Sequence, residues 1–476
     1  MKKLILLILF FLVIFSFCAC GCSDDTVCSV CNATFSNSNN FCPNCEISVK
    51  ESENINDTQE YTLTYIVNGE ITNTINFSKK DLPIITNPIS QEGLVFSGWF
   101  DDSDFNSAPV NRINTIGNKT LYAHFVNNAT CLTYETWGGE ISITDCLFNV
   151  TNVEIPKYIN GVPVTKISND AFAGCDKLKS VIIPDSIKTV WHSAFANCSS
   201  LESIYFPNSI EKFGQSVLSQ CSSLKEVHLP ERLTKIPYST FRFCTSLTTF
   251  DIPDNIVETE TQAFEGCFSL TTVNFPNGFL KIGSNTFSRC TSLEEINLPE
   301  NLIEIGSWAF SGCSSLKTIS IPNSVTDIDY GAFQSCSSLV NIYIPESVTE
   351  FDKVGSIFSG ASSLQSINIS ENNPYFKSMD GVVYSKDGKN LICYPEGQSD
   401  LKFNIPINVT KILSGAFQNN NSLASIYIPK NVLDIEYYAV AYCDALSIYC
   451  ELNAPLQGWE ANWNYSNAPI FYNTTN

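Results

Sequence analysis

The chain has few of the side chains that bind polyanions. Only 16% of its 476 residues are charged, and 27 Lys and Arg stand against 48 Asp and Glu, for a formal net charge of −21. Such a surface repels phosphate backbones and anionic headgroups. The composition therefore argues against nucleic-acid binding and against binding to a membrane through surface charge.

Catalytic patterns are also scarce. The three histidines, His124, His192 and His228, are far apart in the sequence, and none has a neighbouring Asp or Cys pattern that suggests a triad. No Gly-x-Ser-x-Gly motif or phosphate-cradling loop is present. Carboxylates are scattered among expected turns. The sequence predicts that the protein is not an enzyme.

What the chain has in abundance is a 23-residue repeat. Cysteine recurs at this interval from 175 to 336, leucine follows each cysteine after three residues, and proline keeps the same step from 184 to 345. One such coil cannot bury its own apolar side, so we expect coils to stack around a common core. Alternating segments such as Ile342-Tyr343-Ile344-Pro345 predict one short strand per coil, paired in parallel about 4.8 Å from the next.

The Ala-Phe-x-x-Cys-x-x-Leu segment of each coil is expected to return on the other side, with Phe, Cys and Leu pointing inward. Leu218 replaces Phe in this column, a swap between large apolar groups. Equivalent cysteines of adjacent coils would lie about 5 Å apart, which is within reach of disulfides. Parallel side chains in a packed core seldom meet that geometry, so we predict buried, free thiols.

The repeat resembles that of BspA-like leucine-rich-repeat proteins, I-P-x-S-V-T-x-I-G-x-x-A-F-x-x-C-S-S-L-x-x-I. Residues 321–342 follow it closely, with Asp329 in place of the glycine. The resemblance implies a repeat solenoid over 128–452, with 23-residue coils and a parallel β-sheet on one face. A hairpin insertion is expected near 373–395, where Asp-Gly separates apolar strands. Residues 453–476 are expected to cap the solenoid.

A different pattern occupies residues 61–127. Its three apolar anchors, Tyr61–Val67, Phe96–Phe100 and Thr120–Phe125, resemble the Listeria–Bacteroides repeat found beside internalin-type leucine-rich repeats, which implies a small β-grasp-like module. Asp102, Asp104 and Asn106 have the alternate spacing of a calcium loop. They lack its glycine turn and final glutamate, so we expect a solvated loop.

The N-terminus has the form of an export signal. A charged start and an apolar run form residues 1–21, and Ala19-Cys20-Gly21-Cys22 resembles a bacterial lipobox with lipid on Cys22. The alternative is an uncleaved anchor. Both predict an extracytoplasmic protein anchored to the membrane at the cell surface, and the first predicts membrane contact through the lipid alone.

Four cysteines follow in residues 22–50, before a polar linker at 51–60. Cys28, Cys31, Cys42 and Cys45 form two CxxC pairs that resemble a zinc ribbon, and four thiolates would hold one structural Zn²⁺. Metal would be the main source of stability in so short a segment. The alternative is a pair of disulfides, which export to an oxidising side favours.

The surface that remains is the outward side of the expected strands, with one residue per coil. Tyrosines beside short amides and hydroxyls suit contact with proteins or glycans. The alternative is an ordinary solvated sheet face. The ligand-binding candidates are Tyr205, His228, Asp251, Asn274, Asn297, Tyr343 and Tyr427.

Two functions remain open. The resemblance implies a surface-anchored binding protein that recognises extracellular proteins or glycans, for example in adhesion. The other is a passive scaffold of the cell envelope without a specific ligand. A contiguous aromatic patch on the outward side of the strands would favour the first function, and dispersed aromatics the second. Fold alone does not name a ligand.

Overall fold

The computed structural model describes residues 59–89, 91, 94–127, 130–349 and 357–475, together with four short N-terminal strands. These strands are β1 (Asp25–Val27), β2 (Thr34–Ser36), β3 (Phe41–Cys42) and β4 (Ile47–Ser48). β1 pairs with β2 and β3 with β4, both antiparallel. The chain forms two compact units, residues 1–88 with 99–124 and residues 89–98 with 125–476.

The N-terminal module contains a four-stranded sheet in the order β6-β5-β8-β7. A tight turn at Asn68-Gly69, where both φ angles are positive, joins antiparallel β5 and β6, whereas β5 and β8 are parallel. Leu63, Tyr65 and Trp99 are buried, and the Tyr65 and Trp99 rings meet edge to face at 4.8 Å. The strands are β5 (Tyr61–Val67), β6 (Glu70–Phe77), β7 (Leu94–Phe100) and β8 (Lys119–Asn127).

In the second unit, an antiparallel hairpin precedes the regular coils. β9 (Leu132–Trp137) and β10 (Glu140–Cys146) flank Gly138-Gly139, and both glycines have positive φ. β10 then pairs in parallel with β13 (Val162–Ile167). The short β12 (Tyr158–Ile159) pairs antiparallel with β13 across Asn160-Gly161. The hairpin therefore provides the first rung on which the coils stack.

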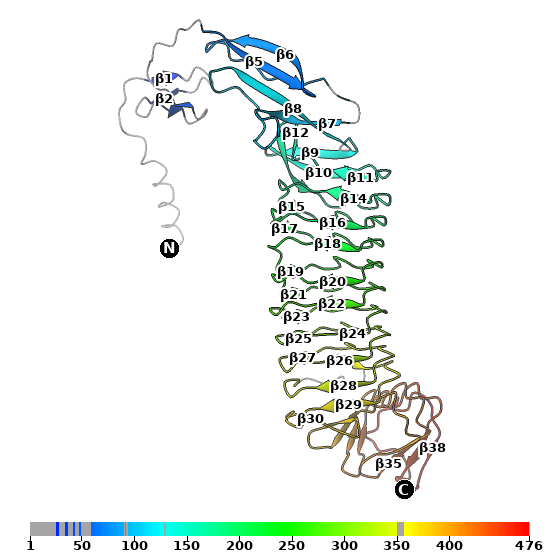
Figure 1. Ribbon diagram of the computed structural model, residues 1–476. Coiled ribbons are helices and arrows are strands. Elements are labelled where there is room, and N and C mark those ends of the chain that lie inside the picture. The colour runs from blue at the N-terminus through cyan, green and yellow to red at the C-terminus, as the bar shows by residue number, and fades with distance from the viewer. Residues whose placement is uncertain are drawn as a thin grey trace, which may run out of the picture. The chain divides into compact units, whose positions relative to one another are not determined.

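Regular coils follow, and Figure 1 shows their strands as two columns within this unit. The first column, strand line 1, contains the alternating segments predicted from the sequence. Its strands pair in parallel one coil apart, for example Ser203 with Glu226. Strand line 1 comprises β11 (Asn152–Glu154), β14 (Ser180–Ile182), β16 (Ser203–Tyr205), β18 (Glu226–His228), β20 (Thr249–Asp251), β22 (Thr272–Asn274), β24 (Glu295–Ile296), β26 (Thr318–Ser320), β28 (Asn341–Ile344) and β29 (Ser366–Ile369).

The second column, strand line 2, adds a parallel ladder that the sequence pattern does not predict. It has two residues per coil, and after β13 it comprises β15 (Thr189–Val190), β17 (Lys212–Phe213), β19 (Lys235–Ile236), β21 (Glu258–Thr259), β23 (Lys281–Ile282), β25 (Glu304–Ile305) and β27 (Asp327–Ile328). Strands of two residues are too short for alternation to show in the sequence.

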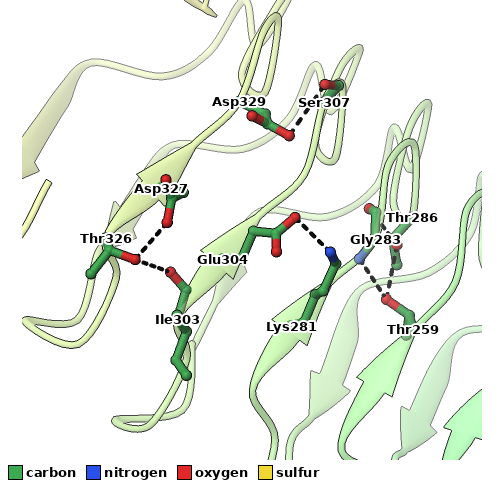
Figure 2. A network of polar contacts seen from close by, with 10 residues as sticks. All are labelled: Thr259, Lys281, Gly283, Thr286, Ile303, Glu304, Ser307, Thr326, Asp327 and Asp329. Atoms are coloured by element: carbon green, nitrogen blue, oxygen red, sulfur yellow. Dashed lines mark hydrogen bonds and ion pairs between the residues drawn. The ribbon is translucent and has the colours of Figure 1, made fainter. Parts of the chain in front are cut away.

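Polar contacts link adjacent coils along strand line 2, as Figure 2 shows. Lys281 Nζ lies 2.7 Å from Glu304 Oε1. Between the coil of Lys281 and the preceding coil, the buried hydroxyls of Thr259 and Thr286 are 2.9 Å apart, and the Gly283 N–H donates to Thr259 Oγ1 at 3.0 Å. These buried hydroxyls therefore have partners, which avoids the cost of unpaired polar groups in the core.

The third side of each coil is the Phe-Cys segment, and its inward residues build the core. The Phe195 N–H donates to Val217 O of the next coil at 3.0 Å, so this side also forms a ladder of hydrogen bonds. The Phe rings stack along the axis, and Phe310 and Phe333 lie 5.5 Å apart and nearly parallel. Leu218 is fully buried in the same column, which confirms the predicted inward set.

The core cysteines are free and buried, as predicted. From Cys198 to Cys336, each Sγ lies 3.1–3.4 Å from the carbonyl oxygen of the residue 26 positions earlier, such as Phe172 for Cys198. The thiol thus fills a small apolar site and donates weakly to the preceding coil. Burial raises the pKa of Cys267 and Cys313 to about 12, so these thiols stay protonated.

An antiparallel insertion separates the regular coils from the last ones. It comprises β30 (Phe376–Met379), β31 (Val382–Ser385) and β32 (Asn390–Cys393), with Asp380-Gly381 at positive φ in its first turn. β32 then joins strand line 2 through β34 (Lys411–Ile412) and β36 (Asp434–Ile435). Strand line 1 resumes with β33 (Lys402–Asn404), β35 (Ser425–Ile428), β37 (Ser447–Cys450) and β38 (Ile470–Phe471).

The C-terminal tail closes the core. The rings of Trp459 and Trp463 are buried and meet edge to face at 5.2 Å, and Trp459 Nε1 donates to Val432 O at 3.3 Å. These two large rings cover the apolar end of the last coil, which would otherwise face water. The tail beyond them supplies β38, which pairs with β37.

Candidate functional site

The outward residues of strand line 1 form a ladder across the stacked coils. In β16, Ile204 is buried while Ser203 and Tyr205 are exposed, and most strands of this line repeat that alternation. Parallel pairing without register shifts places each outward side chain directly beside its equivalent one coil away. The column that contains Tyr205 therefore presents one side chain per coil at regular spacing, and the column that contains Ser203 presents a second.

At its N-terminal part the ladder carries an ordered aromatic pair. The rings of Tyr205 and His228 stack 4.2 Å apart with an interplanar angle of 19°. His228 Nδ1 lies 3.3 Å from Phe206 O, and because a carbonyl can only accept, this nitrogen carries the proton. Tyr205 remains 55% exposed, so the pair is fixed in orientation yet open to solvent.

The middle of the ladder is polar. The Asn274 amide donates to Asp251 Oδ1 at 2.6 Å across adjacent coils, and Asn297 is exposed. Tyr343 is 49% exposed and lies in register between Ser320 and Asn368. Tyr205 and Tyr343 are six coils apart, about 29 Å at normal strand spacing, and therefore belong to different contact areas.

The C-terminal end of the ladder is the most aromatic and is concave. Asn404, Tyr427, Tyr449 and Phe471 follow one another in register on β33, β35, β37 and β38. A hollow of about 230 Å³ opens here. Its lining residues are Lys402, Asn404, Ser425, Ile426, Tyr427, Tyr449, Thr474 and Thr475.

Of these lining residues only Tyr427 is among the sequence-predicted candidates, and it is half-buried rather than exposed. Tyr449 was detectable, because Ser447-Ile448-Tyr449-Cys450 repeats the pattern of Ser425-Ile426-Tyr427-Ile428 after 22 residues instead of 23. Thr474 carried no such signal, because its place beside Tyr427 depends on the path of the tail.

A second group of exposed aromatics was not predicted. Tyr438 contacts both Tyr437 and Tyr465 ring to ring, at 5.6 and 4.9 Å, and Tyr442 lies 5.6 Å from Tyr465. All four rings are exposed. They surround the turn segments of the last coils rather than strand line 1.

In the loop with the spacing of a calcium site, the Asp102 carboxylate accepts hydrogen bonds from backbone N–H groups. The donors are the N–H groups of Asp104, Asn106 and Ser107, at 2.8–3.2 Å. The hydrogen bonds from Ser107, followed by those from the other two residues, lower the pKa of Asp102 to about 2. This pattern is that of an Asx turn.

The predicted anchor and zinc residues lie outside the described part of the chain. Cys22, Cys28, Cys31 and Cys45 are not among the described residues, and Cys42 is described only as backbone in β3. Within the described ranges, no group of three or more His, Cys, Asp or Glu side chains could hold a metal ion.

No helix among the residues that the structure describes has both the length and the apolar character needed to cross a bilayer.

Comparison with known proteins defines the two repeat types. Six copies of the BspA type leucine rich repeat region match residues 142–271, 257–379 and 397–456, which together exceed half of the chain. The Listeria-Bacteroides repeat domain matches residues 61–124. Both repeat types are typical of bacterial cell-surface proteins. A search of curated proteins finds no match.

Among solved structures, a leucine-rich repeat protein from Bacteroides ovatus is 20% identical with a TM-score of 0.46, over 72% of this chain and 98% of that one. A leucine rich cell surface protein from Faecalibacterium prausnitzii is 21% identical with a TM-score of 0.43, over 73% of this chain and 94% of that one.

Proteins built from these repeats are binding scaffolds rather than enzymes, in line with the lack of a catalytic motif in this sequence. The chain belongs to the BspA-type leucine-rich repeat family, and a Listeria–Bacteroides repeat domain precedes its solenoid.

Proposed function

We propose that this chain is a cell-surface binding protein whose ladder on strand line 1 recognises extracellular proteins or glycans, in adhesion or a related contact. The observation that carries the proposal is the Tyr205–His228 stack. Two rings held in fixed orientation and still exposed lose little entropy on contact, and the Tyr hydroxyl can stay hydrogen-bonded while its ring is desolvated.

The strongly acidic composition limits the partner. At a net charge of −21, long-range attraction is available only to basic proteins. Binding to a neutral or acidic partner should therefore not strengthen as salt is lowered, and specificity must come from short-range contacts.

The test begins with the purified chain, immobilised and exposed to extracellular matrix proteins and to an array of glycans. For any partner found, calorimetry compares wild type with the Tyr205→Ala/Tyr343→Ala double variant. Loss of an aromatic anchor weakens binding by about 2 kcal/mol, near thirtyfold. Unchanged affinity in the folded double variant would place the site elsewhere.

A passive scaffold is the second candidate, favoured by the distance of six coils between Tyr205 and Tyr343. Such a scaffold needs no ordered aromatic contact area. Absence of any partner in both the matrix and the glycan screen would favour it over recognition.

We further propose that lipid on Cys22 anchors the chain outside the cytoplasm. The support is the apolar run followed by Ala19-Cys20-Gly21-Cys22. Mass spectrometry of membrane-extracted protein should find a lipidated N-terminus at Cys22. An intact Met1 terminus would refute lipidation.

A further inference from the structure

The hollow at the C-terminal end of strand line 1 differs from the rest of the ladder because it has a rim. The backbone N–H and the hydroxyl of Thr474 each donate to Cys450 O at 3.0 Å, which holds the tail beside the last strands. The Tyr427 hydroxyl donates to Thr474 O at 3.3 Å. The tail and the sheet therefore enclose a space that a flat run of coils does not provide.

Its floor is aromatic and fixed. Tyr427 is held through its hydroxyl, and the ring of Tyr449 stacks on Phe471 at 5.0 Å with an interplanar angle of 20°. Both tyrosines line the hollow. Ordered rings of this kind offer flat apolar surfaces at little entropic cost.

The other lining groups are uncharged polar groups and a single cation. Asn404, Ser425 and Thr475 supply an amide and hydroxyls, which both donate and accept. Lys402 is exposed, and in the described part of the chain no ion pair includes it. By contrast, two other lysines of the last coils, Lys411 and Lys430, are paired with Asp434, Glu436 and Glu451.

The unpaired Lys402 ammonium can contact one anionic group at short range, whereas the net charge of −21 repels polyanions at long range. A single Lys ammonium is a compact charge that matches one carboxylate, whereas phosphate sites usually add Arg or a cluster of backbone N–H groups. The hollow is also smaller than the roughly 300–1,000 Å³ typical of sites for drug-sized ligands, so it suits one small unit of a longer molecule.

We propose that this hollow binds a single carboxylate-bearing sugar unit of an otherwise neutral glycan. The sugar ring lies against Tyr449 and Tyr427, its hydroxyls contact Asn404 and Ser425, and its carboxylate faces Lys402. The inference rests on the proposed function and specifies a ligand class for one end of the same ladder.

The experiment uses the whole chain and two probes, a glucuronate-containing tetrasaccharide and a neutral N-acetylglucosamine tetramer, with affinities measured by calorimetry or NMR titration. Lys402→Gln should weaken binding of the acidic probe about two- to fivefold, the range of an exposed ion pair, and leave the neutral probe unchanged. Tyr449→Ala should weaken the acidic probe about tenfold through loss of ring contact.

Two matched controls separate the hollow from general effects. Lys317→Gln removes an equal charge from another coil, and Tyr442→Ala removes an exposed tyrosine of the last coils outside the hollow. Both should change the affinity less than twofold. Tyr449→Phe keeps the ring and should retain binding, which guards against misreading a folding defect in Tyr449→Ala.

Equal affinity for the two probes, or equal effects of Lys402→Gln and Lys317→Gln, would overturn the assignment. If the chain binds a partner through Tyr205 but neither tetrasaccharide, this inference fails and the proposed function stands. If no partner is found in any screen, the proposed function fails as well.

Discussion

The stacked Phe column should contribute more to stability than the cysteine column beside it. Phe241 is fully buried, with its ring centroid 5.1 Å from that of Phe264 and 5.0 Å from that of Phe250. Phe241→Ala removes these contacts and leaves a cavity that neighbours on three coils cannot all fill. Such a change lowers the free energy of unfolding by about 3–5 kcal/mol.

Cys244→Ala removes much less buried volume than Phe241→Ala does. The Cys244 thiol is fully buried, and its Sγ lies 3.3 Å from Leu218 O. That carbonyl also accepts the N–H of Cys221 at 3.2 Å, so losing the thiol leaves no unpaired polar group. We expect a loss of about 1–2 kcal/mol, mainly for the missing sulfur volume.

Guanidinium denaturation followed by circular dichroism would measure both variants. Native-state hydrogen exchange would be added because a stacked repeat can unfold in parts. Phe241→Leu is the matched control, since Leu218 already occupies this column, and it should cost less than about 1.5 kcal/mol. Tyr343→Ala, on the outer face, should stay within about 0.5 kcal/mol. Equal costs for Phe241→Ala and Cys244→Ala would refute the unequal contributions expected of the two columns.

Three further outcomes are expected. The eight core cysteines from Cys175 to Cys336 should resist a thiol reagent in the native protein and react after denaturation without reductant; disulfides among them would contradict the buried-thiol ladder. Burial raises the pKa of Glu396 above its ordinary value near 4.5, so the folded state holds this proton more tightly than the unfolded state. The protonated Glu396 carboxyl therefore contributes stability that is lost as pH rises from about 4.5 through the raised pKa. Because Gln cannot lose a proton, the free energy of unfolding of Glu396→Gln, measured by denaturation across this range, should fall less with rising pH. Metal analysis of the isolated chain should find about one zinc bound by Cys28, Cys31, Cys42 and Cys45, and two disulfides without metal would exclude it.

The fold was largely predictable because the repeat constrains it at every coil. Residues that must point inward, such as Phe310, Cys313 and Leu316, recur at one interval, and only a stack of coils satisfies all of them together. The sequence pattern did not predict strand line 2, because its strands are only two residues long. The β9–β10 hairpin was not predicted either, because it lies before the repeat and its sequence does not follow the 23-residue period.

The candidate site was predictable only in part. Alternation within each strand identifies outward residues, so Tyr205 and Tyr343 were found on the exposed face. Alternation does not reveal contacts between coils, such as the stacking of Tyr205 on His228. It also cannot place Thr474 beside Tyr427, since 47 residues separate them and the tail does not follow the repeat.

The concave end of the ladder follows from the need to terminate a solenoid. Interior coils bury each other and leave a nearly flat face, whereas the last coil exposes an apolar end that something must cover. Trp459 and Trp463 provide that cover, and the chain beyond them pairs along β37 and crosses beside Tyr427. The cap that stabilises the core thereby also builds a rim. A solenoid of similar coils thus acquires a distinct hollow where its repetition stops.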